Sequence, residues 1–300
     1  MNILLTGGTG LIGRVLCQHL LARGHHLTVW SRQPGRVAAL CGKSVRGIGQ
    51  LAELEGQALD AVINLAGAPI ADRPWSEKRK ALLWASRVTL TEQLLDWLHG
   101  CEIRPEVLIS GSAVGWYGDG GEALLSESQA LPGEDFAARL CAAWEAMALR
   151  GEALGMRVVV LRTGLVLASD GGFLKRLLLP FRLGLGGRIG TGQQWMPWIH
   201  LADQIALIDF LLQQDSAQGP YNACAPAPVR NAEFTRSLAG VLRRPARLPV
   251  PGSLLRLSLG EMAGLLLGGQ RVVPERLQQA GFTFRFTELE TALQDLLGRP

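Results

Sequence analysis

The sequence predicts an α/β protein: a doubly wound parallel sheet with helices on both faces, and a smaller lobe drawn from the second half of the chain. An apolar run at residues 2–6 leads directly into a glycine-rich turn at 7–13. Apolar stretches with strand-like and helix-like spacing then alternate to about residue 167, and the region beyond is rich in glycine and proline. Strands separated by helices pair in parallel through right-handed crossovers, which gives an open sheet covered on both faces.

The individual elements follow from the apolar pattern. Short apolar runs predict strands at 2–6, 26–30, 61–65, 107–110, 157–162 and 221–224. Helical spacing predicts helices at 14–23, 77–98, 136–154, 201–213 and 287–297. Thr287 and Glu290 have the spacing of a capping box at the start of the last helix, and Asp203 is expected to cap the helix at 201–213.

The change of composition predicts two interleaved units. We expect a sheet domain at 1–168 and 198–225, and a substrate lobe at 169–197 and 226–300. At about 150 residues per domain, a chain of 300 residues fits this division. The lobe joins the sheet near His200, which is expected to have a structural role there, and near Trp195 and Trp198, which either wall a cleft or fill the interface.

Composition excludes several classes of protein. Hydrophobic residues make up 48% of the chain and charged residues 19%, so a large core is available and global disorder is excluded. No apolar run reaches the roughly 18–20 residues that span a bilayer, and the first residues lack the pattern of a secretory signal. We therefore expect a soluble, cytoplasmic protein with no membrane partner.

Metal and nucleic-acid sites are not expected either. The five cysteines include no Cys-x-x-Cys pair and the five histidines no His-x-x-x-His spacing, so the sequence supports neither a metal site nor a disulfide framework. The formal net charge is +4, but the basic residues are dispersed along the chain. Because binding to phosphate backbones needs clustered cations, no nucleic-acid partner is expected.

The glycine turn predicts a dinucleotide cofactor. Gly7, Gly10 and Gly13 recur at three-residue intervals between a predicted strand and a predicted helix. In such a turn the first glycine permits the tight reversal, the second lets the backbone approach a pyrophosphate, and the third lets helix and strand pack closely. The N-terminus of the helix then directs unpaired N–H groups at the phosphates.

The end of the second predicted strand indicates which dinucleotide. No acidic residue lies between Thr28 and Arg36, where an aspartate or glutamate would bind the adenosine ribose of NAD. Ser31 and Arg32 stand there instead, and a guanidinium with a hydroxyl can hold a 2′-phosphate. We therefore expect NADP (NADPH) rather than NAD, with Arg36 as a possible second contact.

Several motifs together resemble the extended short-chain dehydrogenase/reductases, the group that includes the nucleotide-sugar epimerases. They lie at residues 6–13, 64–67, 110–113, 117–119, 198–203 and 219–222. Further stretches at 162–164, 180–187 and 269–282 are similar to an atypical branch whose members are called epimerase family proteins. The resemblance covers essentially the whole chain.

The resemblance implies a Rossmann-type domain with the cofactor across the carboxyl edge of the sheet. The pyrophosphate would lie against Gly7, Thr9, Gly10, Leu11, Ile12 and Gly13, and the adenosine phosphate against Ser31 and Arg32. The adenosine and central ribose would lie over Leu65, Ala66 and Gly67. The nicotinamide would lie nearer Ser110, Gly164, Leu165 and Val166.

The chain departs from the family at the acid–base residues. Typical members carry a tyrosine, and a lysine four residues later, on the helix predicted here at 136–154, and the lysine lowers the pKa of the phenol. That helix contains neither residue. Ser112, at the position of the family's catalytic serine, and Tyr117 are the remaining catalytic candidates, beside a water or the substrate itself. Each has a structural alternative: hydrogen bonding for Ser112 and packing for Tyr117.

The sequence thus predicts an NADP-binding, atypical short-chain dehydrogenase/reductase: an oxidoreductase or sugar-nucleotide epimerase-like enzyme of unknown substrate. Hydride transfer to or from a small carbonyl compound, with a nucleotide sugar among the candidates, ranks ahead of epimerisation. Because the Tyr-x-x-x-Lys pair is missing, a non-catalytic NADPH-binding sensor or scaffold is the alternative. The chain is expected to be a monomer or a homodimer.

Overall fold

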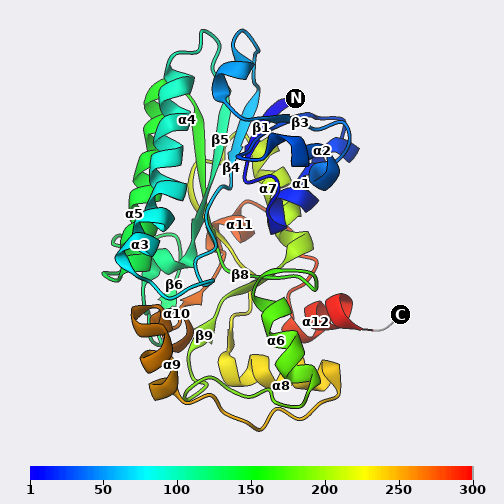
Figure 1. Cartoon of the computed structure of the whole chain (residues 1–300), viewed down its shortest axis with the longest axis vertical. Helices are drawn as coiled ribbons and strands as arrows, with labels where there is room; N and C mark the ends of the chain where they lie inside the picture. Colours follow the sequence, from blue (N-terminus) through cyan, green and yellow to red (C-terminus); the bar gives the residue numbers. More distant parts are fainter. Residues whose placement is uncertain (299–300) are drawn as a thin grey trace.

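A seven-stranded parallel sheet forms the centre of the computed structural model, which describes residues 1–298 (Figure 1). Its strand order is β11-β7-β5-β4-β1-β2-β3. The strands are β1 (Asn2–Thr6), β2 (His26–Trp30), β3 (Arg46–Ile48), β4 (Ala61–Asn64), β5 (Val107–Ala113), β7 (Arg157–Thr163) and β11 (Gly219–Ala223). Because the order runs outward in both directions from β1 and β4, the sheet is doubly wound, and the predicted fold class is confirmed.

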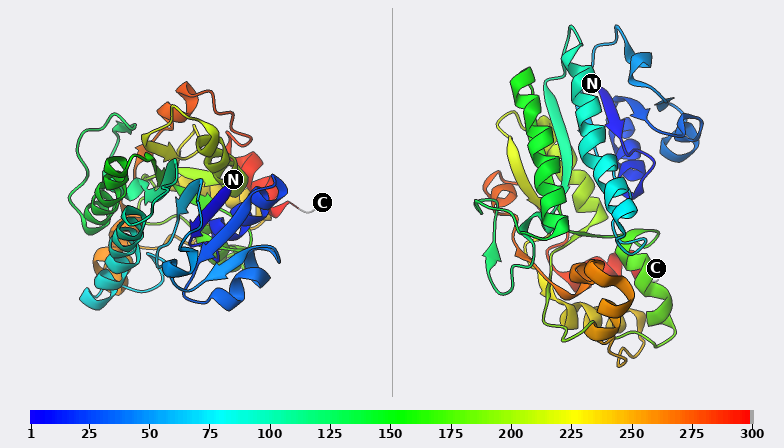
Figure 2. Two further views of the ribbon diagram at one scale, coloured as in Figure 1. Left: turned by 90° about the horizontal axis from the view of Figure 1, so that it is seen from above. Right: turned by 60° about the vertical axis from the view of Figure 1, so that its left-hand side comes forward.

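Helices cover both faces of the sheet. One face carries α1 (Leu11–Ala22), α2 (Val37–Cys41) and α7 (Leu201–Gln213), and the other carries α4 (Leu90–His99) and α5 (Phe136–Leu149). The two views of Figure 2 show these layers from above and from the side. Alternate residues of β1 enter the two cores: Ile3 and Leu5 pack in the first, and Leu4 packs in the second. This alternation is what burial on both faces requires of a central strand.

A separate apolar core lies below the carboxyl edge of the sheet, in the lower half of Figure 1. It is built from β8 (Leu165–Leu167), α6 (Gly172–Arg182), β10 (Trp198–His200), α8 (Asn231–Leu242) and α12 (Leu289–Leu297). The shorter elements of the second half are β9 (Trp195–Met196), β12 (Val229–Arg230), α9 (Gly252–Leu259), α10 (Gly264–Leu267), β13 (Arg271–Val272) and α11 (Glu275–Gln279). The predicted domain boundaries remain a prediction, and residues 299–300 lie outside the described part.

Two expectations about helix boundaries are corrected. The stretch predicted as one helix at 77–98 consists of α3 (Glu77–Trp84), a π-helical segment (Ala85–Thr89) and α4. The last helix begins at Leu289 with Glu288 as its N-cap, so Thr287 does not form the expected capping box. The spacing of apolar residues locates a helix but does not reveal a π-helical turn within it. It also does not determine which of several neighbouring polar residues is the N-cap.

The junction between β10 and α7 ties the C-terminal segment to the sheet, and here the expected role of Asp203 is wrong. His200 caps α7, because its Nδ1 accepts a hydrogen bond from the backbone N–H of Ala202 at 3.0 Å. Asp203 instead accepts the backbone N–H groups of Arg285 and Phe286, at 2.9 and 3.0 Å. His200 also stacks on Phe286 with ring centroids 3.9 Å apart, in agreement with its expected structural role.

Within residues 1–298, none of the helices combines the length and the apolar character needed to cross a membrane.

Candidate functional site

The glycine turn lies where β1 ends and α1 begins, at the point where the strand order reverses. Gly7 has φ +70°, a conformation that side chains disfavour, and a Cβ there would lie 2.6 Å from the carbonyl oxygen of Leu65. A Cβ on Gly13 would lie 2.3 Å from the carbonyl oxygen of Gly7. The turn is therefore packed backbone against backbone, as the dinucleotide-binding arrangement requires.

The first turn of α1 offers hydrogen-bond donors to an anion. Gly10 is the N-cap, without a side-chain cap, and no acidic residue lies in the first turn. The N–H groups of Leu11, Ile12 and Gly13 precede the first intrahelical bond, from Arg14 to Gly10. A pyrophosphate fits this set of donors. Glycine is needed at positions 7 and 13 because neighbouring backbone atoms occupy the space that a Cβ would take.

Buried hydrogen bonds hold the carboxyl ends of the neighbouring strands together. Thr6 Oγ1 donates to Asn64 Oδ1 at 2.7 Å and accepts the N–H of Ala66 at 3.0 Å. Asn64 Nδ2 in turn donates to Thr91 Oγ1 at 2.8 Å and to Ser110 Oγ at 3.3 Å. Because each of these side chains is buried with its partners, residues 65–67 and Ser110 are fixed relative to the glycine turn.

The residues expected at the adenosine phosphate lie at the end of β2. Arg32 is exposed and, among the described residues, makes no hydrogen bond or ion pair. The Oγ of Ser31 accepts the N–H of Gln33, and Arg36 donates to the Gln33 side chain at 3.0 Å. The Arg32 guanidinium is therefore free to meet an anionic group beside β2.

Two segments of the second half close over the same edge. Gly164 packs so tightly on Pro197 that a Cβ would lie 2.6 Å from its carbonyl oxygen. Leu165 and Val166 follow in β8, which pairs with β10. Gly171 lies against the Leu11 side chain, and Arg14 is 3.8 Å from the carboxylate of Asp170. The structure thus brings the predicted cofactor residues of both halves to one edge of the sheet.

A cavity of about 730 Å³ opens beside this edge, between the sheet and the second half. Ala113, Thr163, Gly164 and Leu165 form its end nearest the strands. Trp195 lines the cavity, whereas Trp198 is fully buried in the separate core. Of the two roles expected from the sequence, Trp195 therefore has that of a cleft wall and Trp198 that of a core residue. Ser112 and Tyr117 are not among the lining residues.

Helix α5 presents Ala137 and Cys141 to the cavity, and these are four residues apart. This spacing is the same as that of the tyrosine and lysine expected on this helix in typical family members. Alanine has no titratable group. Burial raises the pKa of the Cys141 thiol to about 12, so this residue is a neutral thiol at physiological pH.

A buried polar cluster lies behind this cavity wall. Glu145 and Arg162, 5% and 3% exposed, form a bidentate ion pair with two N–O distances of 2.9 Å. Ser112 Oγ donates to Glu145 at 2.6 Å. Arg162 donates to the Tyr117 hydroxyl at 3.1 Å, and its guanidinium carbon lies 3.5 Å from the centre of the Trp116 ring.

The Tyr117 hydroxyl is held inside this cluster. It lies 2.8 Å from Asn222 Oδ1 and 3.0 Å from the carbonyl oxygen of Ser126. Burial raises the pKa of Tyr117 to about 12, and the effect of Arg162 in the opposite direction is smaller. For Arg162, burial disfavours the charge, but the bonds from Glu145 outweigh it and raise the pKa. The cluster is therefore a fixed ion pair with two hydroxyls attached.

Sequence reasoning did not single out Glu145. Glu145 is the only charged residue between residues 140 and 149, an otherwise apolar helical stretch, and this was the available signal. Arg87 lies in the π-helical segment and donates to the carbonyl oxygens of Ala68 and Leu83, at 3.0 and 3.3 Å. No carboxylate pairs with it among residues 1–298, and burial lowers its pKa.

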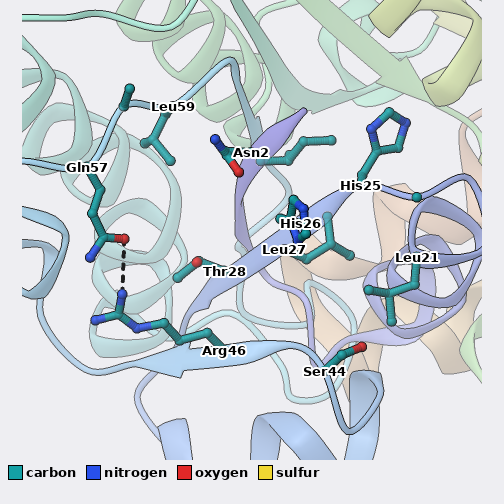
Figure 3. Close-up of a pocket in the computed structure, with 13 residues that line it drawn as sticks. Asn2, Leu21, His25, His26, Leu27, Thr28, Ser44, Arg46, Gln57 and Leu59 are labelled. Atoms are coloured by element: carbon teal, nitrogen blue, oxygen red, sulfur yellow. Dashed lines mark hydrogen bonds between the residues drawn. The ribbon is translucent and has the colours of Figure 1, made fainter.

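A second hollow, of about 670 Å³, lies at the opposite edge of the sheet (Figure 3). Asn2, His26 and Thr28 line it from the amino-terminal halves of β1 and β2, and Arg46 donates to Gln57 across it at 3.0 Å. Ligands of doubly wound sheets bind outside the carboxyl ends of the strands. We therefore place the candidate site at the glycine turn and the 730 Å³ cavity.

Comparisons with known proteins match almost the whole chain. The NAD dependent epimerase/dehydratase family matches residues 3–224, and a domain of unknown function, DUF1731, matches residues 250–296. The epimerase family protein SDR39U1 of Mus musculus is 39% identical over 301 residues, which cover 99% of this chain and 100% of that protein. The chloroplastic SDR39U1 homolog of Arabidopsis thaliana is 38% identical over 304 residues, covering 99% and 87%. A crystal structure of human epimerase family protein SDR39U1 with NADPH has a TM-score of 0.89 and 36% identity over 100% of both chains.

Proposed function

Because the chain belongs to the NAD dependent epimerase/dehydratase family, among the SDR39U1-type epimerase family proteins, we propose that it binds NADP(H) and transfers hydride to or from a small carbonyl or hydroxyl compound. One observation carries the proposal: a glycine turn shaped for a pyrophosphate adjoins a cavity large enough for a substrate. The sheet domain, at 1–168 and 198–225, would hold the cofactor. The lobe, at 169–197 and 226–300, would cover the substrate.

The binding roles proposed for this chain's residues follow the geometry above. The N–H groups at 11–13 bind the pyrophosphate, and Gly7, Thr9 and Gly10 let it approach the backbone. Leu65, Ala66 and Gly67 support the adenosine side, held in place by Thr6 and Asn64. Gly164, Leu165 and Val166, with Ser110, flank the nicotinamide end. When bound, NADPH supplies the hydride, which no side chain of the protein can provide.

Arg32→Asp tests the choice between the two dinucleotides. A charge-assisted bond to the 2′-phosphate contributes about 1.5–3 kcal/mol, and an aspartate adds repulsion, so NADPH affinity is expected to fall about a hundredfold or more. Affinity for NADH, which lacks that phosphate, should change less than about threefold. Titration calorimetry with both dinucleotides measures the ratio.

Arg236→Asp is the matched control for Arg32→Asp. Arg236 is also an exposed arginine, but it lies on α8, away from the glycine turn. This variant has the same net charge and should keep its preference for NADPH. If Arg32→Asp binds NADPH as well as the unchanged protein does, the assignment of the 2′-phosphate site is wrong.

The proton for the reaction has no obvious donor at the cavity. Ser112 directs its hydrogen at Glu145, which leaves its lone pairs free, and Tyr117 is held by Arg162 and Asn222. We propose that water supplies the proton while the cluster keeps this arrangement. Ser112 or Tyr117 could reach the substrate only if the cluster rearranged. The non-catalytic alternative, an NADPH-binding sensor or scaffold, is favoured by the Ala137 and Cys141 positions.

Stopped-flow absorbance separates these functions. With NADPH and a panel of aldehydes and ketones, we expect loss of the reduced-nicotinamide absorbance at a rate above that of the protein-free mixture. Ser112→Ala and Tyr117→Phe should lower that rate about tenfold if the hydroxyls take part. Tight NADPH binding without turnover would support the sensor, and interconversion of sugars with no net absorbance change would support epimerisation.

The remaining expectations are proposals of the same kind. We propose a cytoplasmic protein, active as a monomer or homodimer, and light scattering would establish its oligomeric state. One relative, from Arabidopsis thaliana, is named as chloroplastic.

A further inference from the structure

The wall of the 730 Å³ cavity is mainly apolar. Trp75, Phe173 and Trp195 face it, together with the leucines of α10 at 265–267. Trp75 is fixed by a hydrogen bond from its Nε1 to the carbonyl oxygen of Ile70 at 2.9 Å and by edge-on packing against Phe136. A preformed apolar wall of this kind favours ligands that bury apolar surface.

The charged groups at the wall are more often acidic than basic. Four carboxylates line the cavity, those of Asp72, Asp119, Asp135 and Glu261, against two guanidiniums, those of Arg176 and Arg256. Four minus two leaves two negative charges in excess. Arg176 is already paired with Asp72. Of the lining residues that the structure describes, Arg256 is thus the only cation without a carboxylate partner, and it is exposed.

The cations just outside the wall are also neutralised. Arg230 stacks on Trp195 and forms a bidentate pair with Glu122, with N–O distances of 3.0 and 2.7 Å. Lys80 lies beside Glu261 in an ion pair with an N–O distance of 2.5 Å. A diphosphate carries about two negative charges and is bound by free, convergent cations or helix N-termini. Among the described lining residues, no two free cations converge. The N-termini of α6 and α8 do reach the wall, at Gly172 and Asn231, but the excess of carboxylates there opposes the binding of an anion.

Several donors among the uncharged polar side chains are also used within the protein. The amide nitrogen of Gln194 donates to the carbonyl oxygens of Ile189 and Leu266, at 3.1 and 2.8 Å, which uses both of its hydrogens. Gln270 donates to the carbonyl oxygen of Gly118, and Asn231 donates to the sulfur of Met196. The amide donors of Gln194 are therefore used within the protein, so the wall offers a sugar ring chiefly acceptors, from its carboxylates, and few free donors.

We propose that the substrate is a neutral, predominantly apolar carbonyl compound or the corresponding alcohol, and not a nucleotide sugar or another phosphate ester. The reaction part of this inference rests on the proposed hydride transfer. The binding preference does not depend on it. In the reductive direction, one ketone or aldehyde, one NADPH and one proton give one alcohol and one NADP⁺. The hydride forms the new C–H bond at the carbonyl carbon, and a proton from water forms the O–H bond.

Calorimetry on the NADP⁺-loaded protein, which has no hydride to give to a ketone, tests the preference without turnover. The probes are a matched pair: 2-acetylnaphthalene, and the same ketone carrying a carboxylate at position 6. UDP-glucose is the third ligand. We expect the neutral ketone to bind at least about tenfold more tightly than the carboxylate, and UDP-glucose to give no saturable heat at millimolar concentration.

Two leucine variants locate the binding site. Leu265 lines the cavity and is 36% exposed, whereas Leu257, in α9, is 86% exposed and is not among the lining residues. Leu265→Asp should weaken binding of the neutral ketone at least about tenfold and leave NADPH affinity unchanged. Leu257→Asp, with the same change of charge in the same part of the chain, should leave both unchanged.

Failure of the inference can be told from failure of the proposed function. If the protein does not bind NADPH, the proposed function fails, and the ligand pair still measures the preference on the protein alone. If NADPH binds but UDP-glucose or the carboxylate binds as tightly as the neutral ketone, the inference is overturned and the cofactor proposal stands. Binding by neither ketone, or equal effects of the two leucine variants, would also overturn it.

Discussion

Replacing Glu145 by alanine is expected to lower the free energy of unfolding by about 3–5 kcal/mol. The substitution leaves Arg162, which is 3% exposed, without the carboxylate that accepts two of its N–H groups. Removing one partner of a buried pair strands the other charge in a poorly solvated place. Ser112 also loses the acceptor of its hydroxyl hydrogen. Urea denaturation followed by far-UV circular dichroism measures the loss.

Glu122→Ala is the control for the burial argument. Glu122 also forms a bidentate pair with an arginine, Arg230, but its side chain is 72% exposed. Because solvent screens an exposed pair, this variant should keep nearly the same urea midpoint. The double variant Glu145→Leu, Arg162→Met should be more stable than Glu145→Ala, since it removes the stranded charge. Equal midpoints for Glu145→Ala and Glu122→Ala would mean that the buried cluster is hydrated.

Gly13→Ala is expected to reduce NADPH affinity at least about a hundredfold, which corresponds to about 2.7 kcal/mol. The new methyl carbon would lie 2.3 Å from the carbonyl oxygen of Gly7 and 2.6 Å from the Cα of Gly8, so α1 must move away from the turn. That movement displaces the N–H groups proposed to bind the pyrophosphate. Fluorescence titration with NADPH gives the affinity, and overpacking should also cost about 1–3 kcal/mol of stability.

Gly240→Ala provides the comparison for Gly13→Ala. Gly240 is also a helical glycine, in α8, but a Cβ there meets no atom within 4 Å. Alanine is the better helix former by about 1 kcal/mol, so this variant should be at least as stable as the unchanged protein and should bind NADPH equally well. If Gly13→Ala is folded and binds NADPH within about threefold of normal, the glycine turn does not hold the pyrophosphate.

The sheet could be predicted from the sequence because its strands are continuous apolar runs buried on both faces. The strand at 107–110 extends three residues further in the structure, to Ala113, since Gly111 and Ser112 continue the ladder with Leu161 and Arg162. The short strand β3 was not predicted: its three residues, Arg46–Ile48, carry no apolar run. Asp203 stands at a position typical of a capping residue, but two N–H groups 82 and 83 residues away compete for its carboxylate. Contacts of that range leave no local pattern.

The candidate site also has a part that the sequence predicted and a part that it did not. The glycine turn and the residues after β2 are local motifs, and the structure places them together at one edge of the sheet. The charge of the cavity wall was not predictable, because Asp72, Asp135 and Glu261 come from three distant segments. Nor did the sequence show that Arg162, a strand residue, would meet Glu145 and Tyr117 from two other elements. Such clusters arise from tertiary packing alone.

The position of β11 constrains the order in which the chain can fold. Gly219 pairs with Val159, so this edge strand can join the sheet only after the chain between the two strands, which carries β8, α6, β10 and α7, has been synthesised. Closing a connection of that length carries an entropic cost that slows folding. During synthesis, β7 therefore presents an unpaired backbone edge until residue 223 has left the ribosome. Self-association of nascent chains through this edge is the hazard that chaperones would have to prevent.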